Sequence, residues 1–149
     1  MTHYLAYWKF ENATDTKDSY GGLLRHAASK YYAKVRKQDT VWIVTSEKRR
    51  FFLLGPIVVA DITNTKEAKK RLGRTDLYPA GYHIFPVANS AASMKWTDVT
   101  EELPKLWFSG TKRNRLLPGW GAENLQTMRT LTQGSGKMLQ RIYEEGETI

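Results

Sequence analysis

The chain has 149 residues, of which 41% are hydrophobic and 12% aromatic, so it is about one domain long and has enough apolar side chains for one core. Its 23 Lys and Arg outnumber its 15 Asp and Glu, and a net charge of +8 attracts polyanions, of which nucleic acid is the commonest. The absence of cysteine excludes disulfides and thiolate metal sites and agrees with a reducing cytoplasm.

The first part of the chain predicts a strand, a loop and a helix. Residues 3–10 are a short apolar and aromatic run typical of a strand, with no cationic segment of the kind that opens a signal peptide. Residues 12–22 are polar and contain glycine, which is typical of a loop. From Leu24 to Val35 apolar side chains recur at helical spacing, which predicts a helix.

Two runs rich in β-branched and aromatic residues, 40–45 and 51–62, predict the two strands of a hairpin with a charged tip at 46–50. Gly55-Pro56 predicts a bulge or an edge position in the second strand.

The second half predicts two helices and three further strands. Thr65 is the expected cap of a short helix over 66–72 that Gly73 ends. Further strands are expected at 82–87, 94–99 and 113–117, and a last helix at 135–145 with Met138, Leu139, Ile142 and Tyr143 on its buried side. Hairpins dominate this order, so we expect an α+β fold with a strongly bent mixed sheet or β-barrel flanked by helices, as one domain over 1–149.

Catalytic motifs are not found. The three histidines, His3, His26 and His83, share no close spacing, so we expect no metal site. The segment 134–137 (Gly-Ser-Gly-Lys) resembles part of a phosphate loop, but Met138 stands where Ser or Thr would bind magnesium. We therefore expect a turn there, and a binding protein without catalytic residues or cofactor rather than an enzyme. No apolar run reaches the length of a membrane span, so we expect a cytoplasmic protein with no membrane partner.

Basic residues gather in clusters that together suggest a track for phosphates, although each cluster alone is more often a solvated face. A basic surface can also serve only to keep a protein soluble. The residues expected to contact the nucleic-acid backbone are Lys30, Lys48, Arg49, Arg50, Lys69, Lys70, Arg74, Lys112, Arg113 and Arg115.

Several aromatic residues stand near predicted loops or strand ends, among them Trp8, Phe10, Tyr78 and Tyr82. A flat side chain next to basic residues can stack a nucleobase, which contributes ~1–3 kcal/mol per base. Recognition of a base outside its stack also needs a pocket that offsets the cost of unstacking.

The stretch from Gly21 to Thr45 resembles EVE domains, relatives of YTH domains in the PUA-like superfamily. A glycine-containing loop, an alanine and an aromatic residue, an Asp-containing turn and an apolar strand follow one another in the same register. The start of the chain at 4–9 resembles the family's first strand, and 51–59 resembles its next strand, with Gly55 at a recurrent glycine. The resemblance covers about residues 3–62.

This resemblance implies a PUA-like fold with a pocket for one modified base, between the end of the first strand and the start of the first helix. Carried over by position, the pocket residues are Trp8, Lys9, Phe10, Leu24, Arg25 and His26, with Thr45 and Ser46 from the hairpin. We assign Tyr78 and Tyr82 to the opposite side of the pocket. Arg25 stands where many EVE domains have Asn, and Trp8-Lys9 where they have Lys-Ser, so the identity of the base is not carried over.

The function that the resemblance implies is a reader of a modified base, with methylated DNA favoured over RNA. The base would flip into the aromatic pocket, and the chain would be the targeting module of a modification-dependent restriction or defence system with a nuclease or GTPase partner. One alternative is an RNA-binding module of the same superfamily, for tRNA, rRNA or methylated RNA. Another is an ASCH-type ribonuclease, because 110–112 echoes the Gly-x-Lys of that family. However, 113–115 (Arg-Asn-Arg) does not supply its Glu-x-Arg, and no general acid or base can be assigned.

Overall fold

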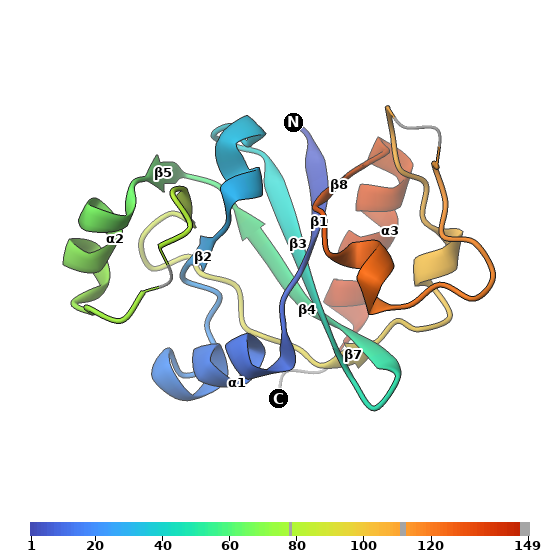
Figure 1. Ribbon diagram of the computed structural model, residues 1–149, viewed down its shortest axis with the longest axis horizontal. Helices are drawn as coiled ribbons and strands as arrows, with labels where there is room; N and C mark the ends of the chain where they lie inside the picture. Colours follow the sequence, from blue (N-terminus) through green and yellow to red (C-terminus); the bar gives the residue numbers. More distant parts are fainter. Residues whose placement is uncertain (78, 111–112, 147–149) are drawn as a thin grey trace.

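A mixed five-stranded sheet, counted over the described residues, forms the centre of the computed structural model (Figure 1). The structure describes residues 1–77, 79–110 and 113–146. The strand order is β7–β4–β3–β1–β8, with β1 parallel to β3 and the other pairs antiparallel. The strands are β1 His3–Tyr7, β3 Thr40–Glu47, β4 Arg50–Val58, β7 Thr97–Asp98 and β8 Arg129–Leu131.

The two faces of this sheet carry two separate cores. Along β1, Tyr4 and Ala6 belong to one core and Leu5 to the other, because successive side chains of a strand point to opposite faces. β3 is buried on both faces, which explains its uninterrupted apolar run. The helix α3 (Gln133–Glu145) covers one face and buries Leu139 completely.

The other face meets a smaller sheet of three strands, β2–β6–β5, which are Ala27–Ala28, His83–Phe85 and Asp61–Thr63. The helices on this side are α1 (Phe10–Ser19), α2 (Thr65–Leu72) and the 3-10 helix η1 (Lys30–Lys34) (Figure 1). Two shorter 3-10 helices, η2 (Leu103–Lys105) and η3 (Ala122–Leu125), lie in the long connection between β7 and β8. The α+β class is confirmed. The sheets are open among the described residues, so closure into a barrel is not observed.

The hairpin and the last helix are confirmed. The predicted irregularity at Gly55 is a bulge, because Ile43 pairs with Gly55 and Val44 with Leu53, so that Leu54 is the extra residue. The strand predictions at 82–87 and 94–99 are confirmed as the shorter β6 and β7. The segment 134–137 is the first turn of α3 rather than a turn before it.

Two predictions for the first part of the chain are wrong. Of the segment 12–22, which the sequence predicts as a loop, residues 12–19 belong to α1 and only 20–22 form a turn. The helix buries only Ala13 and Thr16, so it lacks the apolar stripe by which helices are recognised. Residues 24–35 do not form one helix. Ala27 and Ala28 pair with β6, and Ser29 then caps η1 by accepting a hydrogen bond from the Tyr31 N–H at 3.0 Å.

Two predictions for the second half also need correction. Residues 113–117 do not form a strand, and the edge of β1 is paired instead by β8. The cap of α2 is Asn64 rather than Thr65, because its side-chain oxygen accepts from the Glu67 N–H at 2.9 Å, while Gly73 ends the helix in the left-handed region. Among the described helices, none has the length and apolar character needed to cross a membrane.

Candidate nucleic-acid interface

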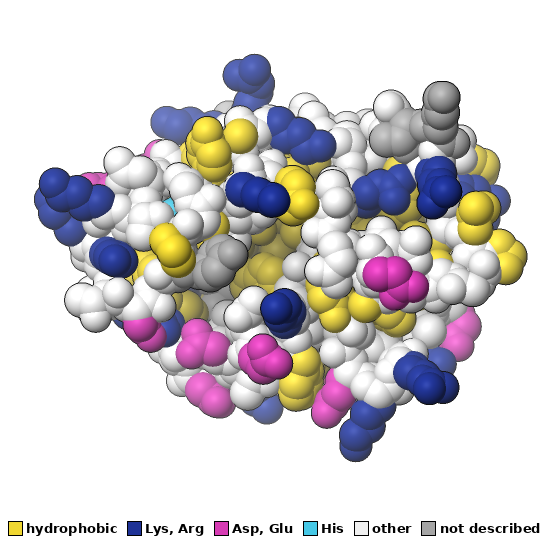
Figure 2. All heavy atoms as spheres, in the orientation of Figure 1, with side chains coloured by type: hydrophobic (Ala, Val, Ile, Leu, Met, Phe, Trp, Pro, Cys, Tyr) yellow, Lys and Arg dark blue, Asp and Glu magenta, His cyan; other side chains and the backbone are white. Residues whose placement is uncertain are grey.

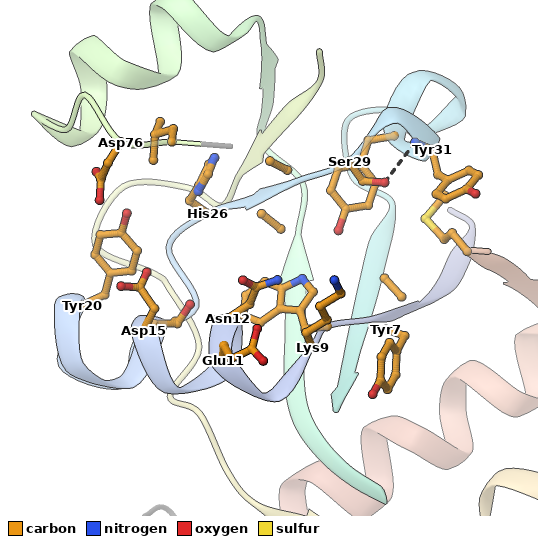
Figure 3. Close-up of a pocket in the computed structure, with 18 of the residues that line it drawn as sticks. Tyr7, Lys9, Glu11, Asn12, Asp15, Tyr20, His26, Ser29, Tyr31 and Asp76 are labelled. Atoms are coloured by element: carbon orange, nitrogen blue, oxygen red, sulfur yellow. Dashed lines mark hydrogen bonds between the residues drawn. The ribbon is translucent and has the colours of Figure 1, made fainter. Parts of the chain in front are cut away.

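A pocket of about 640 Å³ opens where β1 ends and α1 begins, and the segment 26–32 forms its opposite side (Figure 3). Several of its lining residues carry flat rings: Tyr7, Trp8, Tyr20, His26, Tyr31 and Tyr32. Polar side chains lie between them, with Lys9 and Asn12 on one side and Ser29 on the other. The pocket therefore combines stacking surfaces with hydrogen-bonding groups, as sites for flat heteroaromatic ligands do.

Trp8 is held at the end of β1 by the neighbouring strand β3. The backbone N–H of Trp8 donates to the Val44 carbonyl at 2.8 Å, and the backbone carbonyl of Trp8 accepts from the Thr45 hydroxyl at 2.8 Å. The side chain is 9% exposed, so one part packs in the core and the rest faces the pocket. Thr45 is fully buried, and Ser46 forms a hydrogen bond with the Tyr7 hydroxyl at 2.6 Å. Both residues support the strand end from behind and do not line the pocket.

One face of α1 supplies polar groups to the pocket. Asn12, Asp15 and Thr16 line it, at positions that lie on one side of a helix, and Tyr20 continues this side beyond the last turn. Glu11 lines the rim. The sequence predicts a loop here and does not identify these residues, because almost every residue of α1 is polar and no apolar stripe marks the helix.

Two histidines far apart in the sequence meet at the back of the pocket. His26 Nε2 lies 2.7 Å from His83 Nδ1, and His83 Nε2 lies 2.8 Å from the Thr65 hydroxyl. Burial, together with the neighbouring His83 and Arg74, lowers the pKa of His26 to about 4. Burial also lowers the pKa of His83, which is fully buried. Both rings are therefore neutral at pH 7.

Arg74 closes the pocket next to His26. Its guanidinium pairs with Asp76 at 2.8 Å and Asp15 at 3.3 Å, and it donates to the Tyr20 hydroxyl at 3.1 Å. The pKa of Arg74 is raised, mainly by the hydrogen bond to Asp76. This arginine therefore links α1 to the segment after α2, and its charge is largely balanced by carboxylates.

The structure brings Trp8, Lys9 and His26 together at this pocket, but not the other residues predicted to line it. Phe10 opens α1 and contacts Trp96 edge-on, with ring centres 5.8 Å apart. Leu24 is fully buried in the core and does not line the pocket. Arg25 and Tyr82 are exposed and do not line the pocket. Tyr78 lies outside the described residues.

The basic clusters predicted to form one phosphate track lie in three separate parts of the molecule (Figure 1). Lys48 and Arg49 are at the tip of the β3–β4 hairpin, and Lys69 and Lys70 are on α2. Arg50 is paired with Asp98 at 2.8 Å and Glu101 at 3.0 Å, so part of its charge is already balanced. Arg113 and Arg115 lie in the connection between η2 and η3, and Lys112 lies outside the described residues. The nine of these residues that the structure describes therefore do not form a single continuous track.

Lys30, Arg113 and Arg115 of the predicted set lie instead with two further cations next to the pocket. We call this group the basic band: Lys30, Lys34, Arg113, Arg115 and Arg129. The Lys34 ammonium reaches the Thr130 hydroxyl at 3.4 Å, which links η1 to β8. Arg129 precedes Thr130 in β8 and donates to the Arg113 carbonyl, which continues the band. Figure 2 shows Lys and Arg along the upper edge of this face, while Asp and Glu gather below the hollow, over α1. The opening of the pocket therefore has one basic and one acidic edge.

Among the described residues, no group of three or more His, Asp or Glu lies close enough together to hold a metal ion. No protein-family model matches the chain, and no curated protein matches its sequence.

Proposed function

We propose that this chain is a reader of a modified nucleobase, which leaves its stack and enters the pocket beside Trp8. The observation that supports this most directly is a concave site of about 640 Å³ that combines flat rings with Asn12, Ser29 and the Lys9 ammonium. Stacking contributes ~1–3 kcal/mol per base, which offsets the cost of extruding it. A methyl group on that base would add about 0.8 kcal/mol when buried.

The position of the pocket also supports the proposal. Trp8, Lys9 and His26 line it, and these are among the positions to which the resemblance to EVE domains assigns the base site, although the helix expected to open near Leu24 is not formed. On this partial agreement we propose a PUA-like domain of this type. Lys30, whose ammonium lies 5.3 Å from the centre of the Tyr31 ring, sets a positive charge near an aromatic part of the pocket. Phosphates flanking an extruded base would approach from the basic band and away from the carboxylates of α1.

Methylated DNA is the ligand that we favour over RNA. In this proposal the chain binds and does not catalyse, and it directs a nuclease or GTPase partner to modified DNA in a restriction or defence system.

The test is a binding comparison between duplexes that differ at a single base. We would measure affinity by calorimetry for one sequence carrying cytosine, 5-methylcytosine, 5-hydroxymethylcytosine, adenine or N6-methyladenine, and for the RNA of the same sequence. Burial of one methyl group predicts roughly fourfold tighter binding of the preferred modified duplex. Equal affinity for every modified and plain pair would refute the proposal, and tighter binding of the RNA would replace DNA as the ligand.

A matched pair of tyrosine variants locates the base. Tyr31→Ala removes a ring that lines the pocket, whereas Tyr82→Ala removes an exposed ring that does not. Loss of one stacking partner should weaken binding at least fivefold for Tyr31→Ala. Tyr82→Ala should bind as tightly as the protein without substitutions. Equal losses in the two variants would show that the base does not enter this pocket.

A further inference from the structure

A second pocket, of about 290 Å³, lies in the segment between η2 and β8. Three arginines line it, and Glu123 is the one acidic residue among its lining. The lining residues are Arg113, Arg115, Leu116, Leu117, Pro118, Gly119, Trp120, Glu123, Asn124, Thr127 and Arg129. We call this site the arginine pocket. Its charge balance favours an anionic occupant.

Two of the three guanidinium groups are held in place by aromatic faces. The Arg115 guanidinium lies 4.6 Å from the Trp107 ring centre and donates through Nε and Nη2 to the Pro104 carbonyl at 3.3 and 3.1 Å. The Arg129 guanidinium lies 4.2 Å from the Phe108 ring centre. Stacking on a ring fixes the plane of a guanidinium, and the Nη1 side of Arg115, which does not donate to Pro104, is directed to suit a phosphate oxygen.

The cations of the arginine pocket lie close enough to affect one another. Burial lowers the pKa of Arg129, and the positive charge of Arg113 lowers it further. An anion bound between these two groups would reduce this repulsion, because the attraction of each cation to the anion opposes it.

We call the first pocket, of about 640 Å³, the Trp8 pocket. A single segment of chain separates it from the arginine pocket. Gln126 and Met128 line the Trp8 pocket, while the intervening Thr127 and the next residue, Arg129, line the arginine pocket. Side chains therefore alternate between the two sites along this segment. Through Arg129 and Thr130, the arginine pocket is also joined to Lys34 of the basic band.

We propose that the arginine pocket binds a backbone phosphate of the same nucleic-acid strand whose base enters the Trp8 pocket. This inference rests on the proposed function, because it assigns the position of the strand beside the extruded base. The strand would cross the 126–129 segment, with the base on one side and the phosphate on the other. Contacts of this kind position a strand without reading its sequence, so the arginine pocket would raise affinity equally for modified and plain DNA.

Arginine-to-glutamine variants test the assignment. Arg115→Gln and Arg129→Gln each remove one guanidinium from the pocket, and Arg141→Gln is the matched control, because Arg141 is exposed on α3 and lines neither pocket. Affinity for duplex DNA falls as salt rises, and each pocket variant should make the slope of log affinity against log salt less steep by about 0.9. The ratio of affinities for modified and plain DNA should stay unchanged. Arg115 is exposed, so its variant keeps the test valid if Arg129→Gln unfolds the protein.

The result also separates this inference from the proposed function. One outcome is that the protein without substitutions binds modified and plain DNA equally, while Arg115→Gln still weakens the dependence of DNA affinity on salt. The base reader is then refuted and the phosphate site stands. If Arg115→Gln and every folded Arg129→Gln sample behave like Arg141→Gln, the phosphate site is refuted whatever the base preference.

A direct probe distinguishes a strand phosphate from a free one. The indole N–H signal of Trp120, which lines the arginine pocket, would be followed by NMR during titration with inorganic phosphate and with a short unmodified oligonucleotide. We expect the oligonucleotide to shift this signal in the unmodified protein and not in Arg115→Gln. A shift with inorganic phosphate alone would overturn the strand assignment in favour of a free phosphate, and no shift with either probe would overturn the site.

Discussion

Acidification from pH 7 to pH 5 should destabilise this protein through His26. The pKa of an unperturbed histidine is 6.5, whereas in the folded chain burial, His83 and Arg74 lower the pKa of His26 to about 4. Between these two pH values the unfolded chain holds the proton that the folded chain lacks, so the free energy of unfolding falls as the pH falls. The stability is fully present above pH 6.5 and is lost progressively as the pH approaches 4.

The magnitude follows from the two pKa values. The difference between a His26 pKa of 6.5 in the unfolded chain and about 4 in the folded chain corresponds to roughly 3 kcal/mol of stability. About 2 kcal/mol of this is lost between pH 7 and pH 5. These are upper bounds, because His26 lines the pocket and keeps partial contact with solvent. Asp61, Asp76 and Asp98, whose pKa values are lowered from 3.8, contribute only at lower pH.

The assay is urea unfolding at pH 7, 6 and 5, followed by tryptophan fluorescence, for the unmodified protein and for His26→Gln. The variant should lose up to about 2 kcal/mol less than the unmodified protein over this range, since Gln does not titrate. His83 and His3, whose pKa values are also lowered, account for any slope that remains. In an NMR titration the His26 ring should have a midpoint near 4. Two results together would refute this reasoning: the same change of unfolding free energy with pH in both proteins, and a His26 titration midpoint near 6.5.

Two further predictions concern stability. Gly136→Ala should cost about 1–3 kcal/mol, because its new Cβ would lie 2.4 to 2.7 Å from atoms of the His3 ring; the control Gly134→Ala, with nothing within 4 Å, should instead stabilise α3 by up to about 1 kcal/mol. Thermal melting of the two variants checks this, and a shift of both in the same direction would contradict it. Asn64→Ala should cost about 1 kcal/mol through loss of the α2 cap, measured by urea unfolding, and an unchanged midpoint would show that the cap bond is not formed in solution.

Local patterns were sufficient where the chain packs on both sides of an element. The run from Val41 to Thr45 is buried on both faces of the sheet, so its β-branched and aromatic residues indicate a strand without reference to any partner. The spacing of Leu139 with its apolar neighbours likewise indicates the last helix. Local patterns failed at α1, which buries only Ala13 and Thr16 and faces the pocket with polar side chains. At 24–35, helical spacing occurs in a segment that is not one helix, because Ala27 and Ala28 pair with β6 and residues 30–34 form the separate 3-10 helix η1.

The sequence by itself determined the α+β class and the excess of positive charge. Only the tertiary structure decided where the charges lie and which of them pair with carboxylates. Arg50 and Arg74 are paired with carboxylates, and Lys34 reaches the Thr130 hydroxyl next to Arg129 of the basic band. It also brought together His26 and His83, which are 57 residues apart. The physical reason is that periodicity reports which neighbours along the chain share a face, while ion pairing, burial and pKa depend on distances in space between segments that the pattern does not connect.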